Sequence, residues 1–233
     1  PQRAMKAFSQ WRTSWLSREG VFAVAALCTM GLYAFCLIFL GTKLSILGWL
    51  GSILSLISVY CTSMIYGQLK TVPRWNQPLT PVVFMLYTLT GGALLAGQVK
   101  LAGLLMLALA AAQIGHWIVG DKRLLSQGGT IENATGLGHL GKVRLLESPH
   151  SGENYLLHEM AHEVGRKHAQ KLRMIALACV GVLPFLLLML TPAGHATALL
   201  AILLHLAGLF AARWLFFAEA EHVVALFYDK HRG

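Results

Sequence analysis

The sequence predicts an all-α protein that crosses a membrane several times, a polytopic transmembrane helical bundle. Hydrophobic residues make up 56% of the 233 residues and charged residues only 12%, whereas soluble domains carry about 25% charged residues. Apolar runs long enough to span a bilayer, which takes about 20 residues per helix, recur along the chain. Because backbone groups in hydrocarbon must bond internally, we expect these runs to be helices.

Six runs qualify as membrane spans, and polar segments separate most of them. The expected spans are residues 21–41, 45–67, 80–98, 99–120, 174–192 and 196–217. The third and fourth spans adjoin and therefore predict a tight helical hairpin. The remaining segments are a connector (1–20), a long polar loop (121–173) and a tail (218–233).

Charge placement predicts the orientation of the bundle. An even number of spans puts both ends of the chain on one side. Of the 19 lysines and arginines, only Lys43 and Lys100 fall on the other side, and Arg213 lies within the last span. The positive-inside rule then assigns the basic side to the cytoplasm. We interpret these charges as topology signals, with docking of a soluble partner as an added hypothesis and no nucleic acid among the expected partners.

The cysteines argue against a redox centre in this chain. All four (Cys28, Cys36, Cys61 and Cys179) fall inside apolar runs, and none forms a C-x-x-C pair. They are typical of small buried hydrophobic residues, so neither a disulfide framework nor an iron–sulfur site is predicted.

The string HEMAHEVGRKH at 158–168 fits a zinc-protease signature, with His158, His162 and His168 as ligands and Glu159 as general base. Against this, only about fifty polar residues surround the string, which is too few for a folded protease domain. A further membrane span follows almost at once. A membrane-bound zinc metalloprotease is therefore an alternative, with a bound metal otherwise not expected.

Four other stretches carry a resemblance to a known family. They are SWLSRE (14–19), YGQLKTVPRWNQPLTP (66–81), SPHSGENYLLHEMAHEVGRKHAQKLR (148–173) and RWLFFAEAEHVVALFY (213–228). In this order, with the right helices between them, they resemble the membrane anchor subunit of the dimethyl sulfoxide reductase family. In that family, the E-M and R-K-H-A portions belong to the usual loop pattern, which explains much of the protease match without zinc.

The resemblance implies an eight-helix protein, with two helices before the point where this chain begins. The family's His-Leu-Gly-x-Pro element would end at Pro1, so we expect an N-terminally truncated chain without that histidine. The implied role is a non-catalytic anchor of the bacterial inner membrane that oxidises menaquinol in anaerobic respiration. It would pass electrons to an iron–sulfur subunit, which feeds a molybdopterin catalytic subunit. No haem is implied.

Three residues at the start of the first span are the leading quinol-site candidates. Glu19 would accept a proton, since partial burial tunes a carboxyl toward that role. Arg18 and Trp15 would position the ring. The alternative is an interfacial glutamate stabilised by the helix dipole.

The remaining candidates lie elsewhere on the cytoplasmic side. Arg213 is the only basic residue within a predicted span, and we expect Glu219, Glu221 or Glu19 as its partner unless it reaches the membrane surface. Glu219 and His222, in a polar cluster with Glu221, would carry protons or contact the iron–sulfur subunit, or simply end a solvated helix. Trp75 would form the rim of a quinol pocket, or sit in an ordinary connector.

Two histidines and one further class of protein complete the hypotheses. His116 and His205 lie in the fourth and sixth spans, where paired histidines hold haem in some quinol-oxidising anchors, although a hydrogen bond to a neighbouring helix is the commoner role. A membrane transporter is the second alternative. It predicts charged or broken helices near the membrane midplane, and the spans here have almost no central charge.

Overall fold

The computed structural model describes residues 5–126, 131–144, 146, 168–192 and 194–221. All regular structure in these residues is helical, which confirms the predicted all-α bundle. Five helices are long and apolar enough to cross a membrane, and a sixth, α4, is apolar but shorter. The protein is therefore a multi-pass membrane protein.

The chain begins with a short helix, α1 (Lys6–Ser9), followed by the helical hairpin of α2 (Trp15–Phe39) and α3 (Ser45–Gly67). The Ser14 side chain accepts a hydrogen bond from the Ser17 amide and so caps the N-terminus of α2. At the far end, Gly41 adopts a positive φ of 63° in the turn that reverses the chain. Helix α2 starts at Trp15, before the apolar span that was expected to begin at residue 21.

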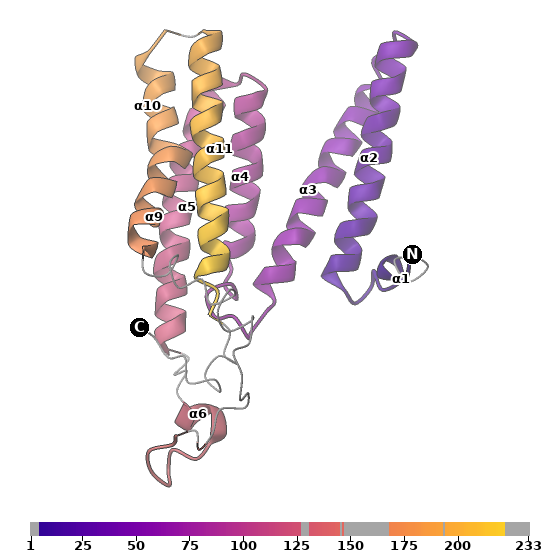
Figure 1. Cartoon of the computed structure of the whole chain (residues 1–233). Helices are drawn as coiled ribbons and strands as arrows, with labels where there is room; N and C mark the ends of the chain where they lie inside the picture. The colour runs from indigo at the N-terminus through magenta and orange to yellow at the C-terminus, as the bar shows by residue number, and fades with distance from the viewer. Residues whose placement is uncertain (1–4, 127–130, 145, 147–167, 193, 222–233) are drawn as a thin grey trace.

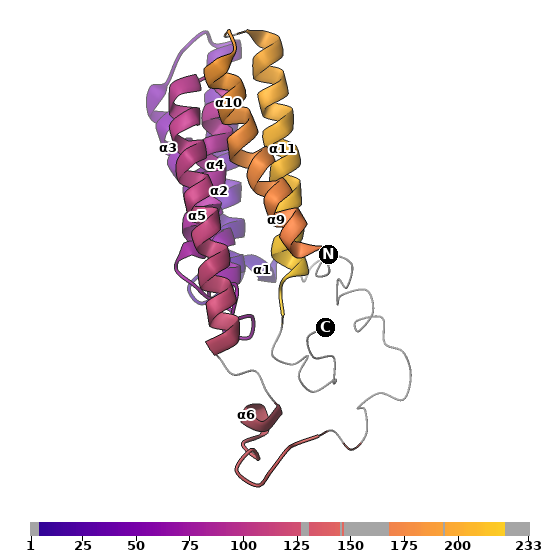
Figure 2. The same ribbon diagram turned by 90° about the vertical axis from the view of Figure 1, so that its left-hand side faces the viewer.

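The second part of the protein contains α4 (Leu79–Leu95), α5 (Val99–Ser126), a continuous helical segment from α9 to α10, and α11 (His195–Ala218). A small helix, α6 (Ile131–Thr135), follows α5. Figures 1 and 2 show α5, α9, α10 and α11 packed side by side, with α4 against α5. We call these helices the bundle. The α2–α3 hairpin contacts it chiefly through α3 and α4.

A π-helical turn interrupts the segment between α9 (Ala169–Leu177) and α10 (Leu183–Leu190) at Ala178–Val182. Pro184 has no amide hydrogen, so the carbonyl of Val180, four residues earlier, loses its helical donor. The ring nitrogen Nδ1 of His205 lies 2.8 Å from that carbonyl oxygen and donates to it. His205 therefore replaces the missing helical donor through a hydrogen bond from a neighbouring helix.

The bundle has two clusters of buried apolar residues among the described residues, and the second includes Val180 of this turn. One contains Ala93, Leu94, Ala102, Met106 and Ala201, and the other Val83, Leu109 and Val180. Large apolar side chains such as Leu27, Ile46 and Phe210 are exposed on the outer helix faces, as expected of faces covered by lipid.

One end of the protein, which we call the basic end, holds the start of α2, the end of α3, the 68–78 loop, the end of α5, the start of α9 and the end of α11 (Figure 1). Most described lysines and arginines lie there. Lys43 and Lys100 lie at the opposite end, in the α2–α3 turn and at the start of α5. All candidate quinol residues that the structure describes belong to the basic end.

Candidate functional site

The first group of candidates lies where α2 meets α3. Glu19 is half-buried, and its Oε1 accepts a hydrogen bond of 2.7 Å from the Thr62 hydroxyl of α3. Trp15, one turn earlier, packs edge-on against Tyr60, with ring centroids 6.0 Å apart. Glu19 forms no ion pair within the part of the chain that the structure describes. Its second oxygen is thus available to a ligand.

Arg18 does not neutralise its neighbour Glu19. Its guanidinium lies 4.3 Å from the centroid of the Trp15 ring and donates to the backbone carbonyls of Trp11 and Arg12, at 2.9 and 2.6 Å. These two hydrogen bonds therefore hold the segment before α2 against the first turn of that helix. Among the described residues, the Glu19 carboxylate is therefore left without a cation partner.

The second group is organised by Trp75, in the loop between α3 and α4. Its indole ring stacks on Phe216 of α11, with centroids 4.9 Å apart and planes at 9°. Its ring N–H donates to the carbonyl of Phe216 at 2.9 Å. Two different interactions therefore fix the loop on the last turns of α11.

Arg213 lies among aromatic rings rather than beside an acid. Its guanidinium carbon is 4.2 Å from the ring centroid of Phe84 and 4.6 Å from that of Phe216, with Tyr66 at 5.8 Å. The expected pairing with Glu19, Glu219 or Glu221 is wrong, since none of these carboxylates lies within ion-pair distance. Cation–π contacts stabilise the charge here.

Polar contacts between α4 and α5 form one wall beside these rings. The Tyr87 hydroxyl donates to the Gln113 side-chain oxygen at 3.1 Å. Thr80 Oγ1 lies 3.2 Å from His116 Nε2 and donates to the Trp75 carbonyl at 2.7 Å. His116 is thus part of a buried hydrogen-bond network.

A four-residue charge cluster closes the basic end of the bundle. Arg173 of α9 binds both carboxylate oxygens of Asp121, at 2.7 and 2.8 Å, and Glu219 at 2.7 Å, while Arg74 also pairs with Asp121. Burial raises the pKa of the Glu219 carboxyl above its ordinary value, although the Arg173 charge pulls the pKa down. Glu219 is therefore a buried carboxyl that accepts protons more readily than a solvated one.

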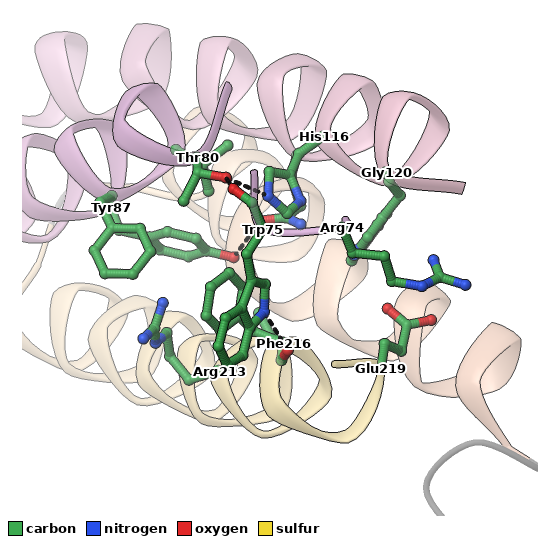
Figure 3. A pocket seen from close by; sticks show the side chains of 14 residues that line it. Arg74, Trp75, Thr80, Tyr87, His116, Gly120, Arg213, Phe216 and Glu219 are labelled. Carbon is green, nitrogen blue, oxygen red and sulfur yellow. Dashed lines mark hydrogen bonds between the residues drawn. The ribbon is translucent and has the colours of Figure 1, made fainter. Parts of the chain in front are cut away.

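A cavity of about 30 Å³ lies among these groups. Figure 3 shows Tyr87 and Arg213 at one end and Arg74 and Glu219 at the other, with His116 between them. Since about 10–15 Å³ on this measure accommodates one water molecule, the cavity holds roughly two. An aromatic ring does not fit inside it as it stands.

Comparison with known proteins decides the family. A family model described as DMSO reductase anchor subunit (DmsC) matches residues 1–219. The chain belongs to this family. One of the subunits of the sulfite dehydrogenase of Allochromatium vinosum is 29% identical over 257 residues, covering 98% of this chain and 78% of that protein. No solved structure matches. Membership implies that this anchor subunit associates with the other subunits of an oxidoreductase complex.

The structure of this anchor subunit separates the predicted residues into two sets. Trp15, Arg18 and Glu19 lie together on α2, whereas Trp75, Arg213 and Glu219 line the cavity at α11. His222 lies outside the described residues, as do His158 and His162 of the histidine string. His168 is described, and it is an exposed residue immediately before α9.

Several residues of the candidate site were not anticipated from the sequence. They are Thr62, Arg74, Tyr87, Gln113, Asp121 and Arg173. Polar residues inside or at the ends of apolar runs were the available signal, since such groups need a partner in a membrane. The sequence does not state which partner, because the contacts join residues 26 to 52 positions apart.

Proposed function

We propose that this anchor subunit binds a quinol, of the menaquinol type, at the basic end of α3 and passes its electrons to an iron–sulfur subunit of the complex. The observation that carries the proposal is the half-buried Glu19 carboxylate, which has one hydrogen bond, from Thr62, and no cation partner within the described chain. Oxidation of a quinol releases protons, and a carboxylate with a free oxygen is suited to accept one.

The depth of three polar groups supports one binding region. Glu19 is four residues from the start of α2, and Thr62 and Arg213 are each five residues from the ends of α3 and α11. At about 1.5 Å rise per residue, all three lie about 6–8 Å inside their helix ends. A headgroup at this depth keeps its isoprenoid tail in the lipid.

Helix α3 supplies a link between the two sets of candidates. Thr62 and Tyr66 are four residues apart and share a helix face. Thr62 bonds Glu19, and Tyr66 packs against Trp75 and Phe216, with centroid distances of 5.1 and 5.4 Å. We propose that the quinol ring lies along this face, outside the small cavity, with Glu19 at one oxygen and Arg213 toward the other.

The test is the variant Glu19→Gln in the assembled complex, with a reduced naphthoquinone analogue as donor. Removing a positioned proton acceptor costs about 10²–10⁴ in rate, so we expect kcat to fall at least about tenfold with assembly unchanged. Glu221→Gln, a carboxyl at the same end without an ion pair in the described structure, is the matched control. Wild-type turnover in assembled Glu19→Gln would remove Glu19 from the site.

The relative from Allochromatium vinosum supports a second candidate, in which the same site reduces a quinone. Its name describes a sulfite dehydrogenase, an enzyme that removes electrons from its substrate. In that direction, Glu19 would donate the proton that it accepts in the first. Measuring whether the whole complex turns over with quinol plus an S-oxide, or with quinone plus sulfite, distinguishes the two.

A further inference from the structure

Buried polar atoms in and beside the cavity near Arg213 are unpaired in the part of the chain that the structure describes. His116 and Gln77 are 7% and 4% exposed. His116 Nδ1, Gln77 Oε1 and Arg74 Nε have no hydrogen-bond partner among the described residues. His116 and Arg74 line the cavity, and Gln77 donates to the backbone carbonyls of both, at 3.0 and 2.7 Å. Buried polar atoms are rarely left unpaired, so each needs an explanation.

The hydrogen-bond network defines the role of each unpaired atom. The Thr80 hydroxyl hydrogen is directed to the Trp75 carbonyl, so Thr80 Oγ1 accepts from His116 Nε2, and His116 Nδ1 is left as an acceptor. Gln77 uses its amide nitrogen on two carbonyls, which leaves its oxygen as an acceptor. Arg74 Nε can only donate. The His116 acceptor and the Arg74 donor belong to residues that line a space for roughly two water molecules, so this space is suited to hold water.

The residues at the two ends of the cavity indicate the direction in which a proton would move through that water. Tyr87 and Arg213 form the end nearer the middle of the membrane, and Glu219 lies at the basic end (Figure 3). Glu219 is the only carboxylate among the lining residues, is 9% exposed, and follows the last residue of α11. A buried carboxyl at the outer end of a polar, water-sized cavity is suited to receive a proton and release it outside.

We infer that this cavity is a hydrated proton-transfer site, in which water held by His116 Nδ1 connects the quinol region near Arg213 with Glu219 as the proton-release group. The inference rests on the proposed quinol oxidation and adds a second route to the one that begins at Glu19. Both quinol O–H bonds break, and two electrons go to the iron–sulfur subunit. One proton goes to Glu19, and the other passes through the water to Glu219.

Two substitutions test the relay without removing the surrounding contacts. His116→Gln places an amide N–H near the position of Nε2, so the bond to Thr80 is retained while the Nδ1 acceptor is lost. Glu219→Gln keeps the side-chain shape and an oxygen toward Arg173 but cannot be protonated. In the whole complex, with the reduced naphthoquinone analogue, we expect each variant to lower kcat about tenfold or more, with KM unchanged and a larger solvent deuterium isotope effect.

Matched controls use groups of the same chemistry outside the cavity. His205→Asn keeps a nitrogen near the position of Nδ1 for the Val180 carbonyl, and Glu221→Gln removes a carboxyl that does not line the cavity. Both controls should retain wild-type turnover and isotope effect. If His116→Gln assembles and both of its values stay within twofold of wild type, the cavity water is only structural and the inference fails. Glu19→Gln then reports separately on the quinol site.

The pH profile supplies a readout that a purely structural role would not change. Glu219 faces Arg173 from α9, with Arg74 and Asp121 also near it. Because burial raises its pKa, the carboxyl stays protonated, and unable to accept, up to a higher pH than an exposed glutamate. Turnover should fall as the pH drops through that raised pKa. In Glu219→Gln the part of the acidic limb that belongs to Glu219 should disappear, leaving the part due to Glu19, and an unchanged limb would contradict the assignment.

Discussion

The α2–α3 hairpin and the bundle differ in how much of each helix is buried and in how many polar contacts join their helices. In α2 and α3, only 11% of the most apolar window of each helix is buried within the protein, against 33% in α5 and 28% in α11. The hairpin has one polar side-chain pair joining its two helices, Glu19 and Thr62, among the described contacts. The bundle instead has a network that joins α4, α5, α9 and α11.

This difference affects how accessible the carboxylates of each region are to a ligand. A carboxylate with one neutral hydrogen-bond donor, on a helix pair with little protein cover, remains open to a ligand from the lipid. The acids of the bundle are held by arginines, and its histidines by Thr80 and Val180. We therefore expect substitutions at the close helix contacts and ion pairs of the bundle to cost more stability than matched substitutions in the hairpin, and substitutions at Glu19 to act on quinol turnover.

The largest contrast should come from adding one methyl group to a glycine in each region. A Cβ on Gly208 would lie 2.4 Å from the Val180 amide nitrogen and 2.6 Å from the Cys179 carbonyl carbon, both backbone atoms of the π-helical turn. On Gly51 of α3 it would meet the Met30 side chain, with Sδ at 2.4 Å and Cγ at 2.7 Å, whereas the nearest backbone atom, the Met30 nitrogen, is at an ordinary 3.6 Å. Gly208→Ala should therefore cost about 3 kcal/mol, the upper end of the usual range for overpacking.

Gly51→Ala should stay within about 1 kcal/mol of wild type, because the Met30 side chain has other rotamers. Gly31→Ala of α2, whose Cβ would meet nothing within 4 Å, serves as the control for the gain in helix propensity. Thermal unfolding of the three detergent-solubilised variants measures the difference. Equal losses in Gly208→Ala and Gly51→Ala would show that the hairpin is packed as rigidly as the bundle.

A smaller difference in stability is expected between variants of two arginines, one in the bundle and one in the hairpin. Arg173→Met removes the cation from Glu219 and one of the two from Asp121, whose side chains are 10% and 38% exposed. We expect a loss of about 2 kcal/mol, less than for a fully buried pair, because Asp121 is partly solvated and keeps Arg74. Arg18→Met removes hydrogen bonds to two exposed carbonyls and should cost about 1 kcal/mol or less. The same thermal measurement ranks them, and the reverse order would place the stabilising charges in the hairpin.

Hydrophobic run length was sufficient to predict the helical fold. The helices nevertheless continue past the apolar runs, with α2 starting at Trp15 and α5 ending at Ser126, because the Ser14 cap and polar helix formers extend a helix beyond the apolar core. The π-helical turn was not predicted. Pro184 marked a weak point in its span, but the compensating donor, His205, comes from another helix.

Local chemistry was enough to select candidate residues from the sequence, but it did not specify the partners of those residues. Glu19, Trp75, Arg213 and Glu219 were singled out as polar or aromatic residues near span ends, and the structure finds each of them in specific contacts. The partner of Glu219 was mistaken. Arg173 seemed only to flank the fifth span, yet it lies 46 residues before Glu219 and reaches it because α9 packs on α11. Such pairings depend on helix packing, which one sequence does not specify.

The smallest expected effect is within the hairpin, and it tests whether Thr62 tunes Glu19. Thr62→Val is nearly isosteric and removes the 2.7 Å hydrogen bond to Oε1, with an expected coupling energy of about 1 kcal/mol for this half-exposed pair. Quinol turnover should change several-fold through that bond, so Thr62→Val should have no further effect once Glu19→Gln is present. A double-mutant cycle on kcat measures this directly. Additive effects would mean that Thr62 acts on the ring or on α3, and the polar contact between α2 and α3 would then be structural, like the Arg173–Asp121 ion pair of the bundle.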